Sequence, residues 1–281
     1  MNSMVDAIKK RTSVRSFEDK NLGDQLKTEI RKLVSENPAV PFSSPVRAQF
    51  IEIENFDVSK LKKLGTYGVI KGASSFVSAT VQKGKYDMLD FGFYFEDLLL
   101  RLTALGFGTC HLGGTLDRSE FGKLMNVKEN EVIPCISPVG IPADKRHFKD
   151  RMLRFMASSA KRKSSEELFF NSEGKQLAGP GLEKMKEILE LVRWAPSASN
   201  RQPWRVSFDE NRAEFHIKRS AIYGKLIEMT IKHDLQMVDI GIAMNHFHHG
   251  IKEIFGTEVK WSDDQKHQNP EKSLFVASCT W

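Results

Sequence analysis

The sequence predicts an α+β fold in which two repeats of one chain intertwine around a central mixed sheet flanked by helices. Its 281 residues correspond to about two domains at roughly 150 residues each. Amphipathic helices alternate with short strand-like segments along the chain. The same order of elements then occurs twice at a nearly constant spacing, which indicates an internal duplication.

Composition places the chain among ordinary globular proteins. Hydrophobic residues make up 40% and charged residues 28%, which excludes wholesale disorder. There is no apolar run of about 20 residues to span a membrane, and the first residues lack an apolar signal segment. The three cysteines are far apart and form no CxxC pair, so we predict neither a disulfide framework nor a metal site. We expect a cytoplasmic protein.

The net charge of +6 and the pI of about 9.1 are compatible with nucleic acid or with a phosphorylated ligand. Most charges are interspersed, and residues 145–163 form the basic stretch. Such a stretch is typical of a solvated helix face. Because aromatic residues are not interleaved with it, we expect no nucleic-acid partner, and we expect no membrane partner either.

The repeat begins with a helix. We predict helices over residues 25–35 and 183–193, because apolar side chains recur on one face of each. Each helix stops ahead of a proline, Pro38 or Pro196, as a helix should. These prolines are 196 − 38 = 158 residues apart, and equivalent positions in the two helices have the same spacing.

A strand follows each helix. We predict strands over residues 49–54 and 205–209, where apolar and polar residues alternate after a Pro-x-Arg sequence. Long apolar helices then begin near Asp90 and Asp239. Their spacing is 239 − 90 = 149, so about nine residues (158 − 149) were lost in the second repeat.

The repeats are predicted to divide at residue 178. Residues 1–178 form the first repeat, and residues 179–281 form a second, shorter one. Residues 161–181 are rich in serine and glycine, which is typical of a connector between repeats.

Three motifs carry chemistry, and the first is the sequence RTSVR at residues 11–15. Two guanidinium groups and two hydroxyls suit a phosphate, because arginine offers a charged planar fork and hydroxyls add short donors. Taken alone, this motif can also be a solvated basic turn.

The second motif, GFGTCHLGGT at residues 106–115, has four glycines within nine residues. Bare backbone allows a close approach by a ligand. The spacing differs from the dinucleotide-binding fingerprint. Gly106 or Gly108 can serve as a helix cap, but a cap does not require Gly113 and Gly114.

The third motif, WAPSASNRQPW at residues 194–204, places serines, an asparagine and a glutamine between tryptophans. These side chains both donate and accept hydrogen bonds, which suits a planar heterocycle. A polar loop with aromatic anchors is the alternative.

Together the motifs resemble those of the nitroreductase-fold, FMN-dependent oxidoreductases, and the resemblance covers nearly the whole chain. In that family each flavin site joins the arginine turn and glycine segment of one subunit to the polar loop of the other. Here residues 37–46 of the first repeat have lost the polar loop, and the second repeat lacks the arginine turn. This resembles the fused, single-chain subgroup and implies one FMN per chain in a monomer that mimics a dimer.

The resemblance implies roles for particular residues. The arginine turn, with Arg162 or Lys163, would hold the phosphate; the paired glycines would face flavin N5; and Lys71 would lie near N1 and C2=O. The implied FMN-binding residues are Arg11, Thr12, Ser13, Arg15, Tyr67, Ile70, Lys71, Leu112, Gly113, Gly114, Arg162, Lys163, Pro196, Ser197, Ala198, Asn200 and Gln202.

The resemblance also implies an activity without a catalytic side chain, because hydride transfer is chemistry of the cofactor. NAD(P)H would reduce the flavin in a ping-pong reaction, and a nitroaromatic, a quinone or a similar flat acceptor would take the electrons. The alternative is a flavin-binding carrier or redox sensor with little turnover.

Two other features invite attention. His233, His246, His248 and His249 suggest a metal, but no carboxylate or cysteine completes a set at ligand spacing. We therefore expect His246 and His249 to lie on a partly exposed helix face. We expect Cys110 to be a packed small side chain.

Overall fold

The computed structural model describes residues 3–18, 21–53, 70–114, 117–143, 161–177, 179–219 and 233–281. Tyr67 and most of the basic stretch lie outside these ranges. Within them, no helix is both long and apolar enough to cross a membrane.

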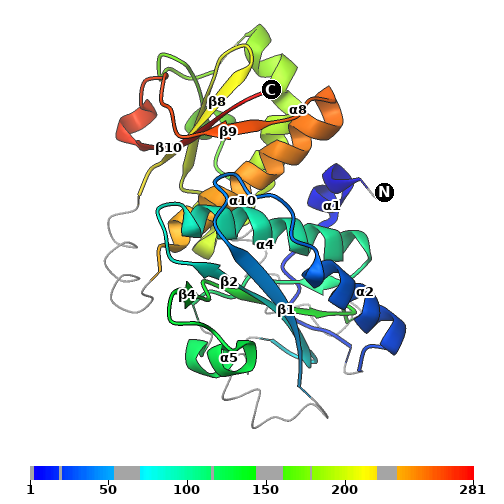
Figure 1. Cartoon of the computed structure of the whole chain (residues 1–281). Helices are drawn as coiled ribbons and strands as arrows, with labels where there is room; N and C mark the ends of the chain where they lie inside the picture. Colours follow the sequence, from blue (N-terminus) through cyan, green and yellow to red (C-terminus); the bar gives the residue numbers. More distant parts are fainter. Residues whose placement is uncertain are drawn as a thin grey trace.

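The first half of the chain builds a five-stranded sheet in the order β1-β2-β5-β3, with β4 paired to β2 (Figure 1). All of its strand pairs are antiparallel. Its elements are α1 (Met4–Lys10), α2 (Asp24–Ser35), β1 (Val46–Glu52), β2 (Ser75–Gln82), α4 (Asp87–Ala104), β3 (Gly108–Thr109), α5 (Arg118–Met125), β4 (Glu131–Val132) and β5 (Ile136–Gly140).

The second half builds another five-stranded sheet, in the order β6-β7-β8-β10-β9. The β6–β7 pair is parallel and the other pairs are antiparallel. The elements are α7 (Ser165–Leu168), β6 (Phe169–Asn171), α8 (Pro180–Trp194), η3 (Ala198–Asn200), β7 (Trp204–Phe208), β8 (Arg212–Ile217), α10 (Leu235–Gly250), η4 (Ile251–Phe255), β9 (Lys260–Ser262), η5 (Pro270–Lys272) and β10 (Leu274–Thr280).

The predicted α+β class is confirmed, and so are the helices α2, α8, α4 and α10 and the strands β1 and β7. The strands divide between two sheets, however, instead of forming the single central sheet that we expected. The segment 161–181 is also more than a connector. Phe169 and Phe170 are buried, and β6 adds a strand to the sheet of the second half.

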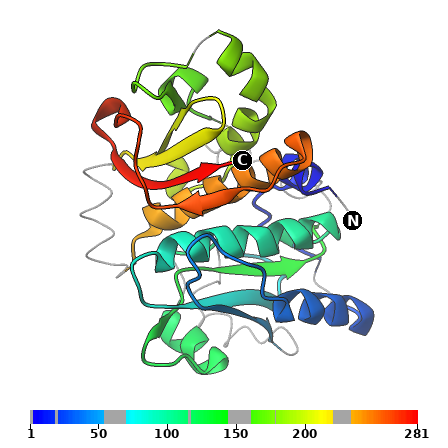
Figure 2. The same ribbon diagram turned by 45° about the horizontal axis from the view of Figure 1, so that its top comes forward.

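Helices α4 and α10 lie one above the other between the two sheets (Figure 2). Their backbones approach closely at Gly92 and Gly241, where side chains would not fit. A Cβ on Gly92 would lie 2.2 Å from the Val238 carbonyl oxygen, and one on Gly241 would lie 2.0 Å from the Leu89 oxygen. The two glycines are 241 − 92 = 149 residues apart, the same spacing that separates Asp90 from Asp239.

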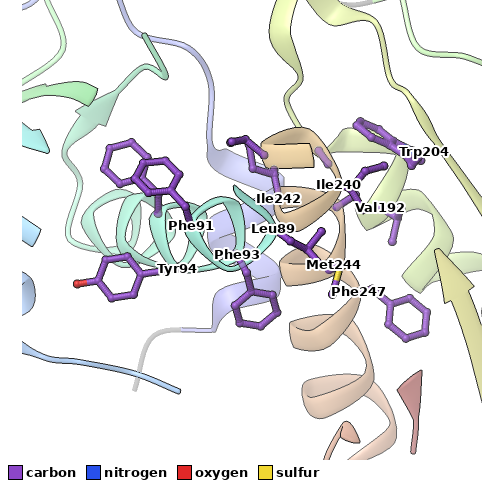
Figure 3. Close-up of a cluster of buried hydrophobic side chains, with 14 of the residues drawn as sticks. Leu89, Phe91, Phe93, Tyr94, Val192, Trp204, Ile240, Ile242, Met244 and Phe247 are labelled. Carbon is purple, nitrogen blue, oxygen red and sulfur yellow. The ribbon is translucent and has the colours of Figure 1, made fainter. Parts of the chain in front are cut away.

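One hydrophobic core joins the halves. Leu89 and Phe91 from α4 pack in the same cluster as Ile240 and Met244 from α10 and Trp204 from β7 (Figure 3). Full burial of such a side chain contributes roughly 1.5–3 kcal/mol. The apolar face of each half is therefore covered by the other half.

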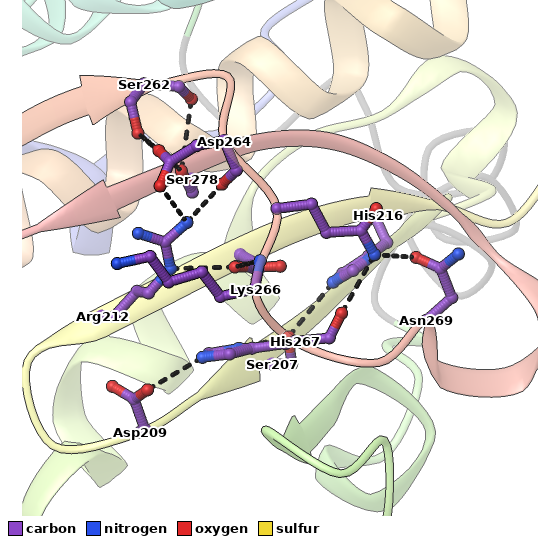
Figure 4. Close-up of polar contacts among 12 residues, drawn as sticks. Ser207, Asp209, Arg212, His216, Ser262, Asp264, Lys266, His267, Asn269 and Ser278 are labelled. Atoms are coloured by element: carbon purple, nitrogen blue, oxygen red, sulfur yellow. Dashed lines mark hydrogen bonds and ion pairs between the residues drawn. The ribbon is translucent and has the colours of Figure 1, made fainter.

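The segment between β9 and β10 is fastened to the second sheet by a buried polar network (Figure 4). The Ser207 hydroxyl lies 3.1 Å from Nε2 of His216 and 2.9 Å from Nδ1 of His267, whose Nε2 lies 3.0 Å from Asp209. A serine, a histidine and an aspartate in contact suggest a hydrolase triad. Ser207 is fully buried, however, and its hydroxyl is held between the two imidazoles, so we interpret the network as structural.

Candidate functional site

Three of the predicted segments from the first half lie side by side. The Val14 amide donates to the Thr109 carbonyl (2.8 Å), and the Lys71 amide donates to the Arg15 carbonyl (2.9 Å). Phe17 in turn donates to the Lys71 carbonyl (2.9 Å). The arginine turn is thus held by backbone hydrogen bonds between residues 70–71 and the glycine segment.

Arg11 stands at the end of α1 and points inward. Its side chain is only 5% exposed, and its Nε lies 3.4 Å from Oε1 of Glu96 on α4. Its Nη1 is buried and has no hydrogen-bond partner among the described residues. A buried guanidinium nitrogen without a partner is costly, so this atom is suited to meet an anionic ligand.

Glu96 is completely buried and gathers further cationic or polar groups. His246 Nε2 lies 2.9 Å from its Oε1, and His111 Nε2 lies 3.3 Å from its Oε2. Burial acts to raise the pKa of Glu96, but Arg11, His246 and His111 outweigh it and hold the pKa below its ordinary value. Burial lowers the pKa of His111 to about 4, so this imidazole is neutral at pH 7.

The expected partly exposed helix face is wrong for His246, whereas His249 is partly exposed. His246 is fully buried, because its Nδ1 bonds to the Leu191 carbonyl (2.7 Å) while its Nε2 bonds to Glu96. His249 binds Asp97 (2.8 Å) and is largely covered. Each imidazole pairs with a carboxylate of α4. Among the described residues, no group of three or more His, Cys, Asp and Glu side chains is placed to hold a metal ion.

Cationic side chains from distant segments gather near Arg11. Burial lowers the pKa of Arg162 to about 10, and the charges of Arg11 and Arg193 act in the same direction. Burial raises the pKa of the Cys110 thiol, against the opposing charges of Arg15 and Arg11. Arg11, Arg15 and Arg162 therefore share one electropositive neighbourhood, which favours an anion. Cys110 itself is buried, as expected.

The polar loop of the second half contacts the segment that carries Arg162. Arg162 Nη1 donates to Asn200 Oδ1 (2.6 Å), the Lys163 amide donates to Gln202 Oε1 (2.8 Å), and Asn200 Nδ2 donates to the Lys161 carbonyl (2.8 Å). These bonds place Asn200 beside the cationic cluster.

The backbone of this loop is strained. Ser199, Asn200 and Gln202 have φ values of 50°, 54° and 48°, in the left-handed region that non-glycine residues seldom adopt. Residues held in this way cost of order 1–3 kcal/mol each and cluster at functional sites. The Ser197 hydroxyl helps to hold the turn by accepting a hydrogen bond from the Gln202 amide (2.9 Å).

A buried carboxylate at the start of each long helix holds the loop of its own half. In the first half, both oxygens of Asp90 accept hydrogen bonds, from the amides of Phe42 (3.0 Å) and Ser44 (2.9 Å). In the second half, Asp239 accepts from the Ala198 amide alone (2.9 Å), and its Oδ2 has no partner among the described residues. Burial raises the pKa of Asp239 well above its ordinary value.

The glycine segment reaches the second half at Gly113. A Cβ there would lie 3.1 Å from a methyl carbon of Leu235, at the start of α10, and 3.6 Å from Cys135 Cβ. Leu112 is fixed by two backbone hydrogen bonds with Ile136 (2.8 and 3.0 Å). Gly114 follows and is exposed. This part of the predicted site therefore lies where the two halves meet.

The structure thus brings the predicted residues into two adjoining groups. One group contains residues 11–15, 70–71 and 112–114, and the other contains residues 162–163 and 196–202. The charge of Arg11 in the first group lowers the pKa of Arg162 in the second. Tyr67 lies outside the described residues. Sequence reasoning missed Glu96 and Asp239. Asp239 is the single carboxylate within α10, and that interruption was the available signal, whereas Glu96 is one of several charged residues on α4.

The chain belongs to the family described as "Putative TM nitroreductase", whose sequence profile matches residues 3–251. A crystal structure from Thermotoga maritima, named as a putative nitroreductase, matches with a TM-score of 0.59 at 21% identity, over 99% of this chain and 93% of that one. This likeness confirms the nitroreductase-like fold that the motifs predicted. Comparison with curated proteins gives no match.

Shorter relatives align with about half of this chain. A nitroreductase-family protein from Clostridium novyi NT gives a TM-score of 0.41 at 17% identity, over 53% of this chain and 89% of that one. An oxidoreductase containing FMN gives 0.45 at 15% identity, over 53% and 82%.

Proposed function

We propose that this protein is an FMN-dependent NAD(P)H oxidoreductase. The observation that carries the proposal is the hydrogen bond from Arg162 to Asn200 of the strained polar loop, with the charge of Arg11 acting on Arg162. Beside it stands the buried Nη1 of Arg11, which has no partner among the described residues. A phosphate would neutralise this cluster and supply the missing acceptor. The family to which the chain belongs supports an oxidoreductase.

The chain's own residues would bind and orient the cofactor. Arg11, Ser13 and Arg15 would bind the phosphate from the first half, and Arg162 or Lys163 would bind it from the other side. The backbone at Gly113 and Gly114 would lie against the reactive edge of the ring, with Lys71 near its pyrimidine side. Leu235, packed against Gly113, would exclude water there. The remaining proposed contacts are Thr12, Ile70, Leu112, Pro196, Ser197, Ala198, Asn200 and Gln202, with Tyr67 outside the described residues.

Bound FMN would supply the redox chemistry, taking a hydride at N5 from NAD(P)H and passing electrons in a second half-reaction to a nitroaromatic, quinone or similar flat acceptor. The protein needs no acid, base or nucleophile of its own for this reaction. It needs a fixed ring and an open face above it.

We also propose that residues 1–178 and 179–281 are fused repeats that mimic a dimer. The meeting of Gly92 with Gly241 and the parallel roles of Asp90 and Asp239 support this organisation. The three cysteines are free and buried, which supports a location in the reducing cytoplasm. A small-molecule acceptor is the partner we propose, with neither nucleic acid nor membrane involved.

The test is reduction of bound flavin. Protein loaded with FMN should lose its visible flavin absorbance when NADH or NADPH is added without oxygen, and a quinone should restore it. Continuous NAD(P)H oxidation with a quinone separates an enzyme from a flavin carrier or sensor, which would be reduced once but would turn over poorly. Free FMN at the same concentration is the control. Protein that cannot bind FMN would refute the proposal.

A further inference from the structure

Glu96 connects four elements around the proposed phosphate site. It lies on α4, Arg11 reaches it from the end of α1, and His111 reaches it from the glycine segment. His246 on α10 binds it too, and also binds the Leu191 carbonyl of α8. Glu96 has no exposed surface. A charge buried this completely needs a reason, because its desolvation is costly unless it is paired.

The contact leaves Nη1 of the Arg11 guanidinium without a partner among the described residues. Glu96 approaches Nε of the same group at 3.4 Å. A guanidinium carries five N–H donors in a planar fork. An ion pair at the Nε edge therefore favours one direction for the two terminal nitrogens.

Electrostatic repulsion means that Arg11 needs a residue such as Glu96 to keep it in place. The charge of Arg11 disfavours the charged form of Arg162, and the charges of Arg15 and Arg11 both act on Cys110. A long arginine side chain under repulsion would turn away toward water. The carboxylate of Glu96 offsets that repulsion from the buried side and keeps Arg11 in place.

We propose that Glu96 is a positioning residue that aims the terminal nitrogens of Arg11 at a phosphate group lying between Arg11 and Arg162. This role rests on the proposed flavin function and adds to it. It predicts that Glu96 contributes to binding of the phosphate part of the ligand and contributes nothing to binding of the ring.

The same pair of helices provides a matched control. Asp97 follows Glu96 on α4, is also buried, and also binds a histidine of α10, His249, at 2.8 Å. Its arginine partner is Arg101, at 2.7 Å, which is not among the proposed site residues. Loss of Asp97 removes a similar carboxylate–imidazole bridge without touching Arg11.

The experiment compares FMN with riboflavin, which has the same ring system and no phosphate, in wild type, Glu96→Gln and Asp97→Asn. Dissociation constants come from quenching of flavin fluorescence. We expect Glu96→Gln to weaken FMN binding by about tenfold, the loss of one charge-assisted contact, with riboflavin binding unchanged. Asp97→Asn should keep the wild-type preference for FMN. General damage to the site would weaken both ligands equally.

A double-mutant cycle then tests whether Glu96 acts through Arg11. Arg11→Ala should weaken FMN binding, and adding Glu96→Gln to it should cause no further loss, because the group being positioned is gone. Glu96→Asp keeps the buried charge but withdraws the carboxylate, and covers the case in which Glu96→Gln does not fold. We expect it to give an intermediate loss for FMN alone.

The outcomes are separable. If wild type prefers FMN and both Glu96 variants keep that preference or bind FMN more tightly, the positioning role is wrong while the proposed function stands. If wild type binds neither flavin, the proposed function fails, and this role fails with it.

Discussion

At the scale of single residues, burial controls the protonation of several imidazoles. It lowers the pKa of His111, His216 and His248 to about 4 in each case, from an ordinary value of 6.5. The native protein therefore holds these side chains neutral near pH 7. The unfolded chain takes up protons at about pH 6.5, whereas the folded chain does so only near pH 4.

This difference predicts acid sensitivity. Because the unfolded state binds more protons between pH 6.5 and 4, the free energy of unfolding should be highest above pH 6.5 and should fall as the pH drops through that window. A shift of this size corresponds to about 3 kcal/mol for one histidine.

His248→Phe isolates one of these contributions. The His248 ring packs edge-on against Phe93, and its Nδ1 has no partner among the described residues, so a phenyl ring should keep the packing and lose no hydrogen bond to that atom. Urea unfolding at pH 7 should change by less than about 1 kcal/mol. At pH 5 the variant should be more stable than wild type. Parallel pH profiles for the two proteins would contradict this account.

The residue scale also shows what the sequence could predict. RTSVR and the polar loop predict a phosphate and a planar ring through their residue types, and the prediction depends on taking the motifs together. Glu96 and Asp239 predict only that a buried partner exists for each carboxylate, and they do not identify it. The partner of Glu96 is an arginine 85 residues earlier (96 − 11) and a histidine 150 residues later (246 − 96), and no local pattern specifies such pairs.

At the scale of elements, the crossing of α4 and α10 depends on bare backbone. Gly241→Ala places a Cβ 2.0 Å from the Leu89 oxygen and 2.8 Å from the Phe93 nitrogen. Backbone cannot rotate away as a side chain does, so the helices must separate. We expect destabilisation by about 3 kcal/mol, at the upper end for overpacking, measured by urea unfolding.

Gly122→Ala in α5 is the matched control, and it should change the free energy of unfolding in the opposite direction. Its Cβ would meet nothing nearer than a Val127 methyl carbon at 4.0 Å. Replacing glycine by alanine inside a helix then stabilises it by up to about 1 kcal/mol. Equal effects of the two substitutions would mean that helix propensity, and not the crossing, determines stability at Gly241.

Helices were easier to predict than sheets for a physical reason. The apolar period of α2 and α8 and their proline stops are local signals. The pairing of β6 with β7 joins residues 169–171 to residues 206–208 across a helix, and strand pairing of this kind depends on the assembled core. The division of the strands into two sheets follows from the same non-local packing.

At the scale of the whole molecule, the two halves are similar in architecture and different in chemistry. Asp90 and Asp239 lie near the starts of the two long helices. Both oxygens of Asp90 accept hydrogen bonds from loop amides, whereas among the described residues only one oxygen of Asp239 does so. In the first half, Phe42 and Ser44 occupy the places that Asn200 and Gln202 occupy in the second. The paired glycines likewise occur in the first half alone, since residues 258–262, which follow Gly256 and Thr257 in the second half, contain no glycine.

This asymmetry predicts one flavin per chain. A second site would need an arginine turn in the second half and a polar loop in the first, and its loop would offer Phe42 where the proposed site offers Asn200. Titration of a concentrated protein solution with FMN should therefore quench flavin fluorescence up to one equivalent and no further. Arg11→Ala should weaken FMN binding at this one site, and no second binding phase should appear. A break at two equivalents would mean that both junctions between the halves bind flavin. The loss of the polar loop from the first half and of the arginine turn from the second would then have no effect on flavin binding.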